Sequence, residues 1–314
     1  MEVVMIRSII IFISFVFALS SNYTYAEIVF DGRFSDGDFS RYGVLEANGN
    51  VVSGASTPNG IQARLERVQD SAGSANSVMR ATYIAGDIAT NSGYRSEASA
   101  FKDPIGSERW YSWGYYLPDT WKYVKVDSAI AQIHDTPDKD ESGFRNPTLG
   151  LIIQDNKVKL INAFDHDAIT SPSGIKSTVG VDFERRELTS WELETEKWTY
   201  LDLHVKWAAD DTGSLEFWKD GVLLFQEHNH INTFNDKAGV WFKNGIYSWT
   251  PGTESISAYS TGVLIGDGKE TFQSMSMSVV SEPSSYMMMM AGLLSIGFFA
   301  SKRRFSPKFA GTNT

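Results

Sequence analysis

Short runs of alternating apolar and polar residues, separated by turn-forming residues, recur through the central part of the chain. Residues 201–207 (LDLHVKW) alternate at every step until the final tryptophan, which is typical of a strand with one buried face. Residues 149–161 and 215–225 each place a polar Asp-containing turn between two apolar runs, which predicts two hairpins. No long segment keeps the 3.6-residue period of an amphipathic helix. The pattern therefore predicts a single all-β domain, an antiparallel sandwich.

The first residues have the composition of an export signal. Arg7 precedes an apolar run from Ile9 to Leu19, and small or polar residues then lead to Ala26. A basic start, a short apolar core and small residues before the cleavage point are typical of a secretory signal peptide, here residues 1–26. A buried helix or a membrane anchor is the alternative, but the apolar core is short for a bilayer.

The last residues carry a second targeting pattern. Ser281-Glu282-Pro283-Ser284 precedes an apolar stretch from 287 to 300, and three basic residues follow at 302–304. Basic residues after an apolar span orient that end toward the cytoplasm. The segment 282–314 resembles the PEP-CTERM sorting tail of Gram-negative bacteria, although Ser281 replaces a proline and ten residues follow Arg304. The resemblance implies an exosortase-type processing enzyme as a partner, with a plain transmembrane helix as the alternative. Either tail places the domain in the periplasm, on the cell surface or outside the cell.

Charge and cysteine content narrow what residues 27–281 can do. The whole chain has a formal net charge of −10; the N-terminal segment 1–26 is neutral and the C-terminal segment 282–314 carries +3, so the central region carries −13. This excludes nucleic acid as a partner and means that an anionic ligand must meet local basic groups in a cleft. The chain has no cysteine, so it has neither disulfides nor a cysteine nucleophile or metal ligand. About 250 residues are enough for one monomeric domain with a self-sufficient core.

Three strand-like segments carry polar residues at alternate positions. Because side chains two residues apart in a strand project to the same side, each pair shares a face. A lone polar pair is usually a solvated surface, but three such pairs suit a wet, functional sheet. The pairs are Arg95 and Glu97, Gln132 and His134, and Lys243 and Tyr247.

These segments resemble a known set of motifs. In order, residues 95–97 (RSE), 132–134 (QIH) and 242–247 (FKNGIY) resemble the three signature motifs of jelly-roll polysaccharide lyases. That superfamily includes alginate lyases, glucuronan lyases and heparin lyase I, and the likeness spans roughly residues 90–266. The resemblance implies a β-jelly roll of the concanavalin-like type with a concave substrate face. It also implies β-elimination on a uronic-acid-containing polyanionic polysaccharide.

The resemblance assigns roles to the six side chains. Arg95 and Gln132 match residues that hold the substrate carboxylate, while His134 and Tyr247 match the proton-transfer pair. Tyrosine commonly donates to the leaving oxygen in this family, and either group takes the C5 proton. Tyr247 can be the base only if cations depress its pKa, and Lys243 and Arg95 are the available ones. Glu97 is expected to orient Arg95. No cofactor or catalytic metal is implied.

Departures from the motifs bear on the substrate. Ala98-Ser99-Ala100 lacks the third arginine of the alginate type, and Ser248-Trp249 replaces the usual Asn-Gln. Trp241 stands where a tyrosine is usual. These changes favour a glucuronan-like or other uronate polymer over alginate.

Several other features have competing interpretations. Glu192, Glu194 and Glu196 suggest the acidic strand of a jelly-roll glycoside hydrolase, which needs two flanking carboxylates. A non-catalytic carbohydrate-binding protein would keep the same sandwich. The acidic loop 135–141 could hold a structural calcium ion, although it lacks the spacing of an EF-hand. The histidines without motif support are expected to be structural; these are His166, His204, His228 and His230.

Overall fold

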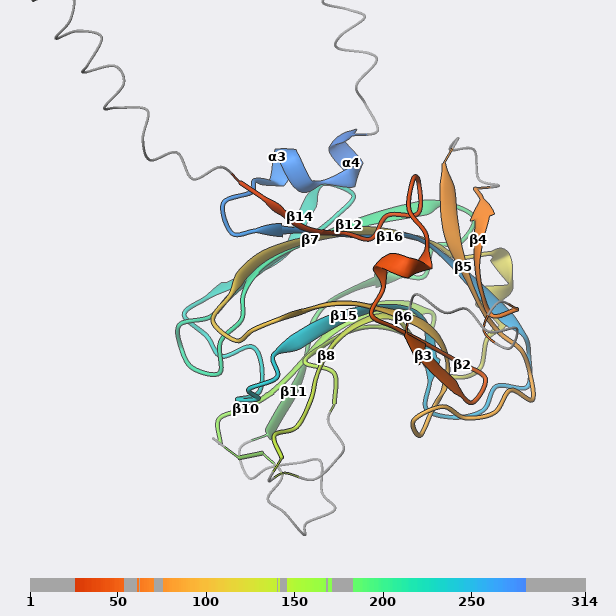
Figure 1. The fold of residues 1–314 in the computed structure, drawn as a ribbon, viewed down its shortest axis with the longest axis horizontal. Coiled ribbons are helices and arrows are strands. Elements are labelled where there is room, and N and C mark those ends of the chain that lie inside the picture. Colours follow the sequence, from red (N-terminus) through yellow and green to blue (C-terminus); the bar gives the residue numbers. More distant parts are fainter. Residues whose placement is uncertain are drawn as a thin grey trace, which may run out of the picture.

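The computed structural model describes residues 26–53, 61, 63–70, 76–139, 141, 146–167, 169–170 and 183–280. These residues form two eight-stranded antiparallel sheets that lie face to face (Figure 1). The predicted all-β jelly roll is confirmed. We call the two layers the upper and the lower sheet, after their places in Figure 1.

The upper sheet has the strand order β14-β13-β12-β7-β16-β5-β4, with β1 paired to β16. Two short α-helices lie on its outer side (Figure 1). Its elements are β1 (Ile28–Asp31), β4 (Leu65–Gln69), β5 (Ser77–Tyr83), β7 (Glu108–Tyr116), β12 (Trp198–Lys206), β13 (Ser214–Lys219), β14 (Val222–His228), β16 (Ile256–Asp267), α3 (Phe272–Met275) and α4 (Met277–Val280).

The lower sheet has the order β11-β10-β9-β8-β15-β6-β2-β3. Its three central strands, β8, β15 and β6, come from distant parts of the sequence. Two 3₁₀ turns, η1 (Phe39–Arg41) and η2 (Asp119–Tyr123), lie in connections. The strands are β2 (Val44–Ala47), β3 (Asn50–Ser53), β6 (Tyr94–Asp103), β8 (Ser128–Asp135), β9 (Leu149–Gln154), β10 (Lys157–Asp165), β11 (Phe183–Glu192) and β15 (Val240–Ser248).

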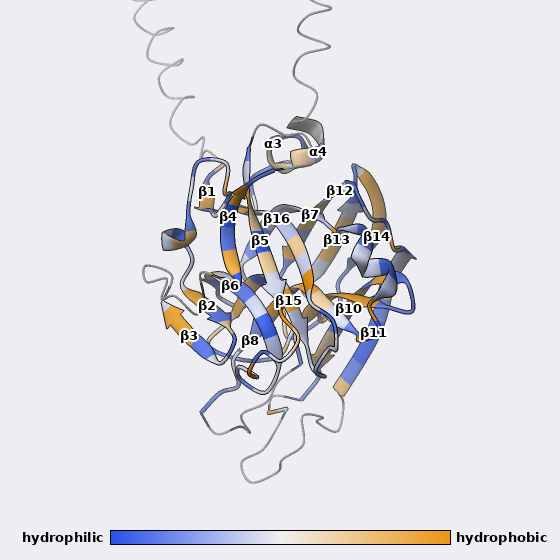
Figure 2. Cartoon of the chain, turned by 90° about the vertical axis from the view of Figure 1, so that its right-hand side faces the viewer, coloured by the Kyte–Doolittle hydropathy of each residue, from blue (hydrophilic) through white to orange (hydrophobic). Residues whose placement is uncertain are grey.

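Alternation along the strands fills the space between the sheets. Leu201, Leu203 and Val205 of β12 are fully buried, whereas His204 and Lys206 point outward and are partly exposed. The strands in Figure 2 change accordingly between hydrophobic and hydrophilic colours along their length. The predicted half-buried strand is therefore confirmed.

Both predicted hairpins form, and their turns have the same geometry. Asp155 and Asn156 join β9 to β10 with φ values of 53° and 58°. Asp220 and Gly221 join β13 to β14 with φ values of 48° and 81°. Two successive positive φ angles define a type I′ turn, which matches the twist of the flanking strands and favours Asn, Asp and Gly.

The C-terminal segment of the described chain is fastened to the outer face of the upper sheet. The Ser276 hydroxyl donates to Asp202 Oδ2 at 2.7 Å, and the Ser112 hydroxyl donates to Asp202 Oδ1 at 2.6 Å. Burial raises the pKa of the Asp202 carboxyl, although these hydrogen bonds oppose the shift. Trp110 and Met275 pack in a small apolar cluster beside them. Helices α3 and α4 therefore cover the sheet that does not carry the motif strands.

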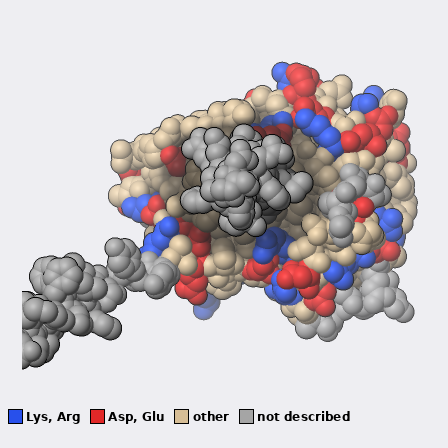
Figure 3. Space-filling view, turned by 90° about the horizontal axis from the view of Figure 1, so that it is seen from above, with Lys and Arg blue, Asp and Glu red and all other residues tan. Residues whose placement is uncertain are grey.

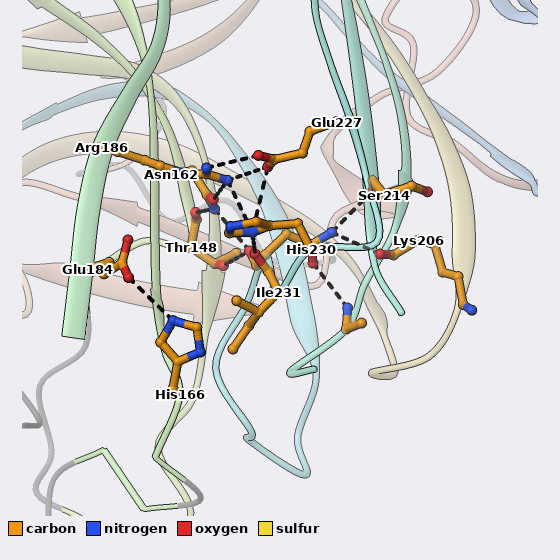
Figure 4. Close-up of polar contacts among 12 residues, drawn as sticks. Thr148, Asn162, His166, Glu184, Arg186, Lys206, Ser214, Glu227, His230 and Ile231 are labelled. Atoms are coloured by element: carbon orange, nitrogen blue, oxygen red, sulfur yellow. Dashed lines mark hydrogen bonds and ion pairs between the residues drawn. The ribbon is translucent and has the colours of Figure 1, made fainter. Parts of the chain in front are cut away.

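A polar network joins one edge of the lower sheet to the upper sheet (Figure 4). Arg186 of β11 forms a two-pronged ion pair with Glu227 of β14, with Nη1 at 3.0 Å from Oε1. Asn162 donates to the backbone oxygens of Thr148 and Asn232 at 2.8 and 2.9 Å. These contacts hold the two layers together where the apolar core ends.

The four histidines without motif support lie in such structural contacts. His230 Nδ1 lies 2.6 Å from the Ile231 carbonyl oxygen, and His166 lies 3.3 Å from Glu184 (Figure 4). His204 and His228 lie on the upper sheet beside Glu216. None of the four lines the cavity described below.

The predicted leader and tail lie largely or wholly outside the described residues, which exclude 1–25 and 281–314. Within the described part of the chain, no helix is both long enough and apolar enough to cross a membrane.

Candidate active site

The three motif strands are neighbours in the lower sheet, with β15 between β6 and β8. Tyr247 is paired with Arg95 across β15 and β6. On the other side of β15, Lys243 is paired with Gln132 and Trp241 with His134. Paired residues of adjacent strands project to the same face. The side chains predicted from three distant stretches are therefore brought together on one face of the lower sheet.

These side chains line a cavity of about 1030 Å³. Its wall is formed by residues from all eight strands of the lower sheet, from Val51 of β3 to Arg185 of β11. A cavity of this size matches or exceeds most small-ligand sites and extends well beyond one sugar ring. Five of the six predicted site residues line it, and the sixth, Glu97, is buried beneath. The five are Arg95, Gln132, His134, Lys243 and Tyr247.

A buried cluster of four charges forms the floor of the cavity. Lys243 Nζ lies 2.5 Å from Glu46 Oε2 and 3.1 Å from Glu97 Oε2. Arg95 Nη1 lies 3.5 and 3.3 Å from the same two carboxylates. All four side chains are at most 9% exposed, so the pairs are little screened by solvent. The two positive and two negative charges balance within the cluster.

Glu46 is a site residue that sequence analysis missed. It comes from β2, which carries no recognisable motif, and it is paired with Glu97 across β2 and β6. Burial opposes its ionisation, but the positive charges of Lys243 and Arg95 prevail and lower the pKa of Glu46. Asn91 also donates to Glu46 Oε1 at 2.6 Å. Only the order of the strands reveals this residue, because nothing near position 46 signals a site.

Glu97 gathers the two residues expected to hold a carboxylate. Besides the ion pair with Arg95, it accepts a hydrogen bond from Gln132 Nε2 at 2.5 Å. This amide nitrogen has a second N–H, and Gln132 Oε1 is buried with no hydrogen-bond partner in the described part of the chain. The amide and the guanidinium are therefore fixed in position from below.

His134 is held in one tautomer. Its Nδ1 lies 2.6 Å from the Asp135 carbonyl oxygen, which can only accept, so Nδ1 carries the proton and Nε2 has the lone pair. Burial, reinforced by the charge of Lys243, lowers the pKa of His134 to about 4. The ring packs against Trp241 with centroids 5.5 Å apart. At neutral pH His134 is therefore an uncharged proton acceptor.

The pKa of Tyr247, unlike that of His134, is raised. The Arg95 guanidinium lies 4.3 Å from the centre of its ring. Burial raises the pKa of Tyr247; Arg95 and Lys243 counteract this, but Glu97 and Glu46 reinforce it. The net shift is upward because the carboxylates balance the cations. The condition under which Tyr247 could act as the base, a pKa depressed by Lys243 and Arg95, is not met.

The acidic segment that suggested a hydrolase has a different geometry from the one expected. Strand β11 ends at Glu192, and Glu194 and Glu196 lie in the connection that follows, where Glu196 has φ 59°. Glu194 pairs with lysines, and Glu196 accepts hydrogen bonds from Tyr116 and from the backbone of Asp119. The expectation of three carboxylates on one strand face is wrong, because the strand ends in a turn.

No group of three or more metal-ligating side chains occurs in the described ranges. The acidic loop 135–141 is only partly within them, since residue 140 is excluded. Asp138 accepts a hydrogen bond from the Lys237 backbone and forms an ion pair with its ammonium group. A structural calcium ion in this loop stays a prediction.

A protein family and several solved structures resemble this chain. The protein-family model described as "Polysaccharide lyase" matches residues 34–263. No curated protein sequence matches the chain significantly.

Among solved structures, the endo-β-1,4-glucuronan lyase of the fungus Trichoderma reesei is similar, with a TM-score of 0.61 and 19% identity over 80% of this chain and 98% of that chain. An alginate lyase in complex with dimannuronate has a TM-score of 0.48 at 12% identity, over 74% and 94% of the two chains. An alginate lyase of Pseudomonas aeruginosa has a TM-score of 0.45 at 14% identity, over 74% and 100%. The likeness to the fungal enzyme establishes a shared fold.

Proposed function

This chain belongs to the polysaccharide lyase family, and we propose that it cleaves a uronic-acid-containing polysaccharide by β-elimination in the cavity of the lower sheet. The observation that carries the proposal is the convergence of Arg95, Gln132, His134 and Tyr247 on one cavity wall. Each of the four supplies a function that elimination next to a carboxylate requires.

The first requirement is neutralisation of the substrate carboxylate. The proton on C5 is barely acidic while the adjacent carboxylate keeps its full negative charge. In the proposed complex this carboxylate accepts hydrogen bonds from the second N–H of Gln132 and from the Arg95 guanidinium, beside the Lys243 ammonium. Positive groups fixed by buried partners stabilise the charge that develops on the carboxylate during proton removal, without reorganising.

The second requirement is a base and an acid. We assign the base to His134 Nε2, which takes the C5 proton, and the acid to the Tyr247 hydroxyl, which donates to the 4-linked oxygen. The electron pair of the C5–H bond becomes the C4=C5 double bond as the C4–O bond breaks. The lowered pKa of His134 leaves its Nε2 unprotonated at neutral pH, and the raised pKa of Tyr247 keeps the proton on its hydroxyl, as this assignment requires. Exchange with water then restores both groups.

We infer a glucuronan-like polymer as the substrate. The missing third arginine after Glu97 and the tryptophans at positions 241 and 249 separate this site from the alginate type. The fold shared with a glucuronan lyase supports the same choice. A panel of purified polyuronates, tested for turnover one at a time, distinguishes these substrates.

We also propose that the chain is exported. On this proposal residues 1–26 are removed as a signal peptide, residues 27–281 form the lyase domain, and residues 282–314 are a PEP-CTERM-like tail. An exosortase-type enzyme would process the tail and leave the domain in the periplasm, on the cell surface or outside the cell. Mass spectrometry of the mature protein tests both cleavages. An intact tail on cytoplasmic protein would contradict the proposal.

Ultraviolet absorbance of the products tests the proposed reaction. Elimination leaves a C4=C5 double bond conjugated to the carboxylate, which absorbs, whereas hydrolysis or binding alone creates no such chromophore. Purified protein incubated with a polyuronate should therefore give rising absorbance. Shortening of the polysaccharide without a rise in absorbance would indicate a hydrolase. The absence of both changes would indicate a binding protein.

A further inference from the structure

Four cationic side chains of the described residues line the cavity, and two of them form no ion pair with a carboxylate in the described ranges. Arg95 and Lys243 form ion pairs with the buried glutamates, as described above. Lys102 and Arg185 are exposed in the cavity wall, and neither forms an ion pair with any residue that the structure describes. On the face that Figure 3 shows, basic side chains generally lie beside acidic ones. On an acidic protein, two cations in one cavity that no described carboxylate neutralises require an explanation.

The two cations lie in one row across the sheet, on opposite sides of the base. Lys102 of β6 is paired with Trp241, which is paired with His134. Continuing the β8–β9 register places Thr148 opposite His134, since Ile133 is paired with Leu149.

The row then reaches the far edge of the sheet. The Ala163 N–H donates to the Thr148 carbonyl at 2.9 Å, and Ala163 is paired with Arg185. From His134, Lys102 is therefore two strands away on one side, and Arg185 is three strands away on the other.

Local backbone geometry directs both side chains to the cavity. Ser99 is paired with Lys243. Because the register between β6 and β15 then shifts, the next pair joins Lys102, three residues later in β6, to Trp241, two residues earlier in β15. Lys102 Nζ lies 4.8 Å from the centre of the Trp241 ring, a cation–π contact that positions it without neutralising it. Arg185 alternates with Arg186, which points to the other face and is paired with Glu227.

We propose that Lys102 and Arg185 bind carboxylates of substrate sugars on opposite sides of the reacting sugar and so determine specificity. This inference rests on the proposed function. Strands are spaced by about 4.8 Å, so the backbone positions of Lys102 and Arg185 flank that of His134 at roughly 10 and 14 Å along the row. A 1,4-linked pyranose is about as long as one strand spacing. A polysaccharide bound along the row therefore places the second sugar from the reacting one at Lys102. On the other side it places the third sugar at Arg185.

Because one cation meets the second sugar and the other meets the third, the site favours one class of polymer. A homopolymer with a carboxylate on every sugar meets both cations. A polymer in which uronates alternate with neutral or amino sugars meets Lys102 but leaves Arg185 without a carboxylate. Arg185 is therefore the residue that distinguishes the two classes.

Charge-removing variants test the inference. Lys102→Gln and Arg185→Gln are compared with Lys206→Gln, which makes the same charge change on the outer face of the upper sheet. Exposed ion pairs contribute up to about 1 kcal/mol, so each cavity variant should raise KM for a homopolyuronate roughly two- to fivefold, with little change in kcat. Added salt should reduce the difference. For an alternating polymer, only Lys102→Gln should raise KM.

Binding is measured separately from turnover, by retardation of each variant in a gel that contains the homopolyuronate. Weaker retardation of both cavity variants but not of Lys206→Gln supports the inference, even if no variant or wild-type protein yields an absorbing product. The absence of an absorbing product from the wild-type protein would instead overturn the proposed lyase reaction. If all proteins are retarded equally and share one KM, Lys102 and Arg185 do not bind substrate and the inference is wrong.

Discussion

Glu46 and Glu97 are paired across strands β2 and β6, and both carboxylates contact the same ammonium group, that of Lys243. Two like charges directly opposite each other in a sheet repel. Here Lys243 and Arg95 compensate them, and the four groups together carry no net charge. The balance matters for the chemistry above it, because the protonation states of His134 and Tyr247 depend on the sum of these charges.

Glu46→Gln should shift the alkaline side of the activity profile. The substitution leaves the cluster with excess positive charge, and Glu46 is one of the groups that raise the pKa of Tyr247. Tyr247 should therefore lose its proton, and its ability to donate, at a lower pH than in the wild type. The pH dependence of kcat measures the shift. Glu66→Gln, which breaks the half-exposed pair with Arg80 on the upper sheet, is the control and should leave the profile unchanged.

Tyr247→Phe should remove the proton donor and lower kcat by about 10²- to 10⁴-fold, the usual contribution of general acid catalysis. Stability should be nearly unchanged, because the hydroxyl makes no hydrogen bond to any described residue. Initial rates and the thermal midpoint measure the two effects. Tyr123→Phe, at a tyrosine that is 63% exposed, controls for loss of a hydroxyl. Full activity of Tyr247→Phe would remove this residue from the reaction.

His134 should make the protein less stable in mild acid. Its pKa is about 4 when folded and 6.5 in the reference state. Between these values the unfolded chain binds a proton that the folded protein does not, so the free energy of unfolding falls as pH drops from 6.5 to 4. His134→Gln should flatten this decline. Urea denaturation at a series of pH values tests it, and equal slopes in the two proteins would contradict the lowered pKa.

Gly93→Ala should impair turnover by displacing Tyr247. A Cβ at position 93 would lie 2.1 Å from Tyr247 Cε2, closer than any allowed contact, so the ring has to move. We expect kcat to fall at least tenfold, because catalytic groups tolerate displacements of well under 1 Å. Gly43→Ala on the rim of the same cavity is the control, since its nearest neighbour would be 3.9 Å away. Similar kinetics for the two variants would show that the contact with Gly93 is unimportant.

Ser276→Ala should destabilise the fold without affecting catalysis. It removes a hydrogen bond to the buried Asp202 carboxylate, which should cost about 1–3 kcal/mol of unfolding free energy. The site lies on the opposite sheet, so kcat and KM should stay at wild-type values. Ser35→Ala, at an exposed serine with one weak hydrogen bond of 3.4 Å, controls for the loss of a hydroxyl. Equal thermal midpoints for the two variants would contradict the proposed anchor.

Sequence alone determined several of the strands and which of their side chains share a face. Residues 201–207 and the pairs 132/134 and 95/97 could be assigned because facing is a local property with a period of two. The hairpin turns at 155–156 and 220–221 were predictable for a similar reason, since Asn, Asp and Gly tolerate positive φ.

Only the tertiary structure decided which strands are neighbours and what charges the site residues carry. The placement of β15 between β6 and β8, and of Glu46 beside Glu97, depends on pairings between segments far apart in the sequence. The protonation states of His134 and Tyr247 depend on burial and on charges from other strands, which no local pattern encodes. The register shift that directs Lys102 to the cavity is likewise a property of the assembled sheet.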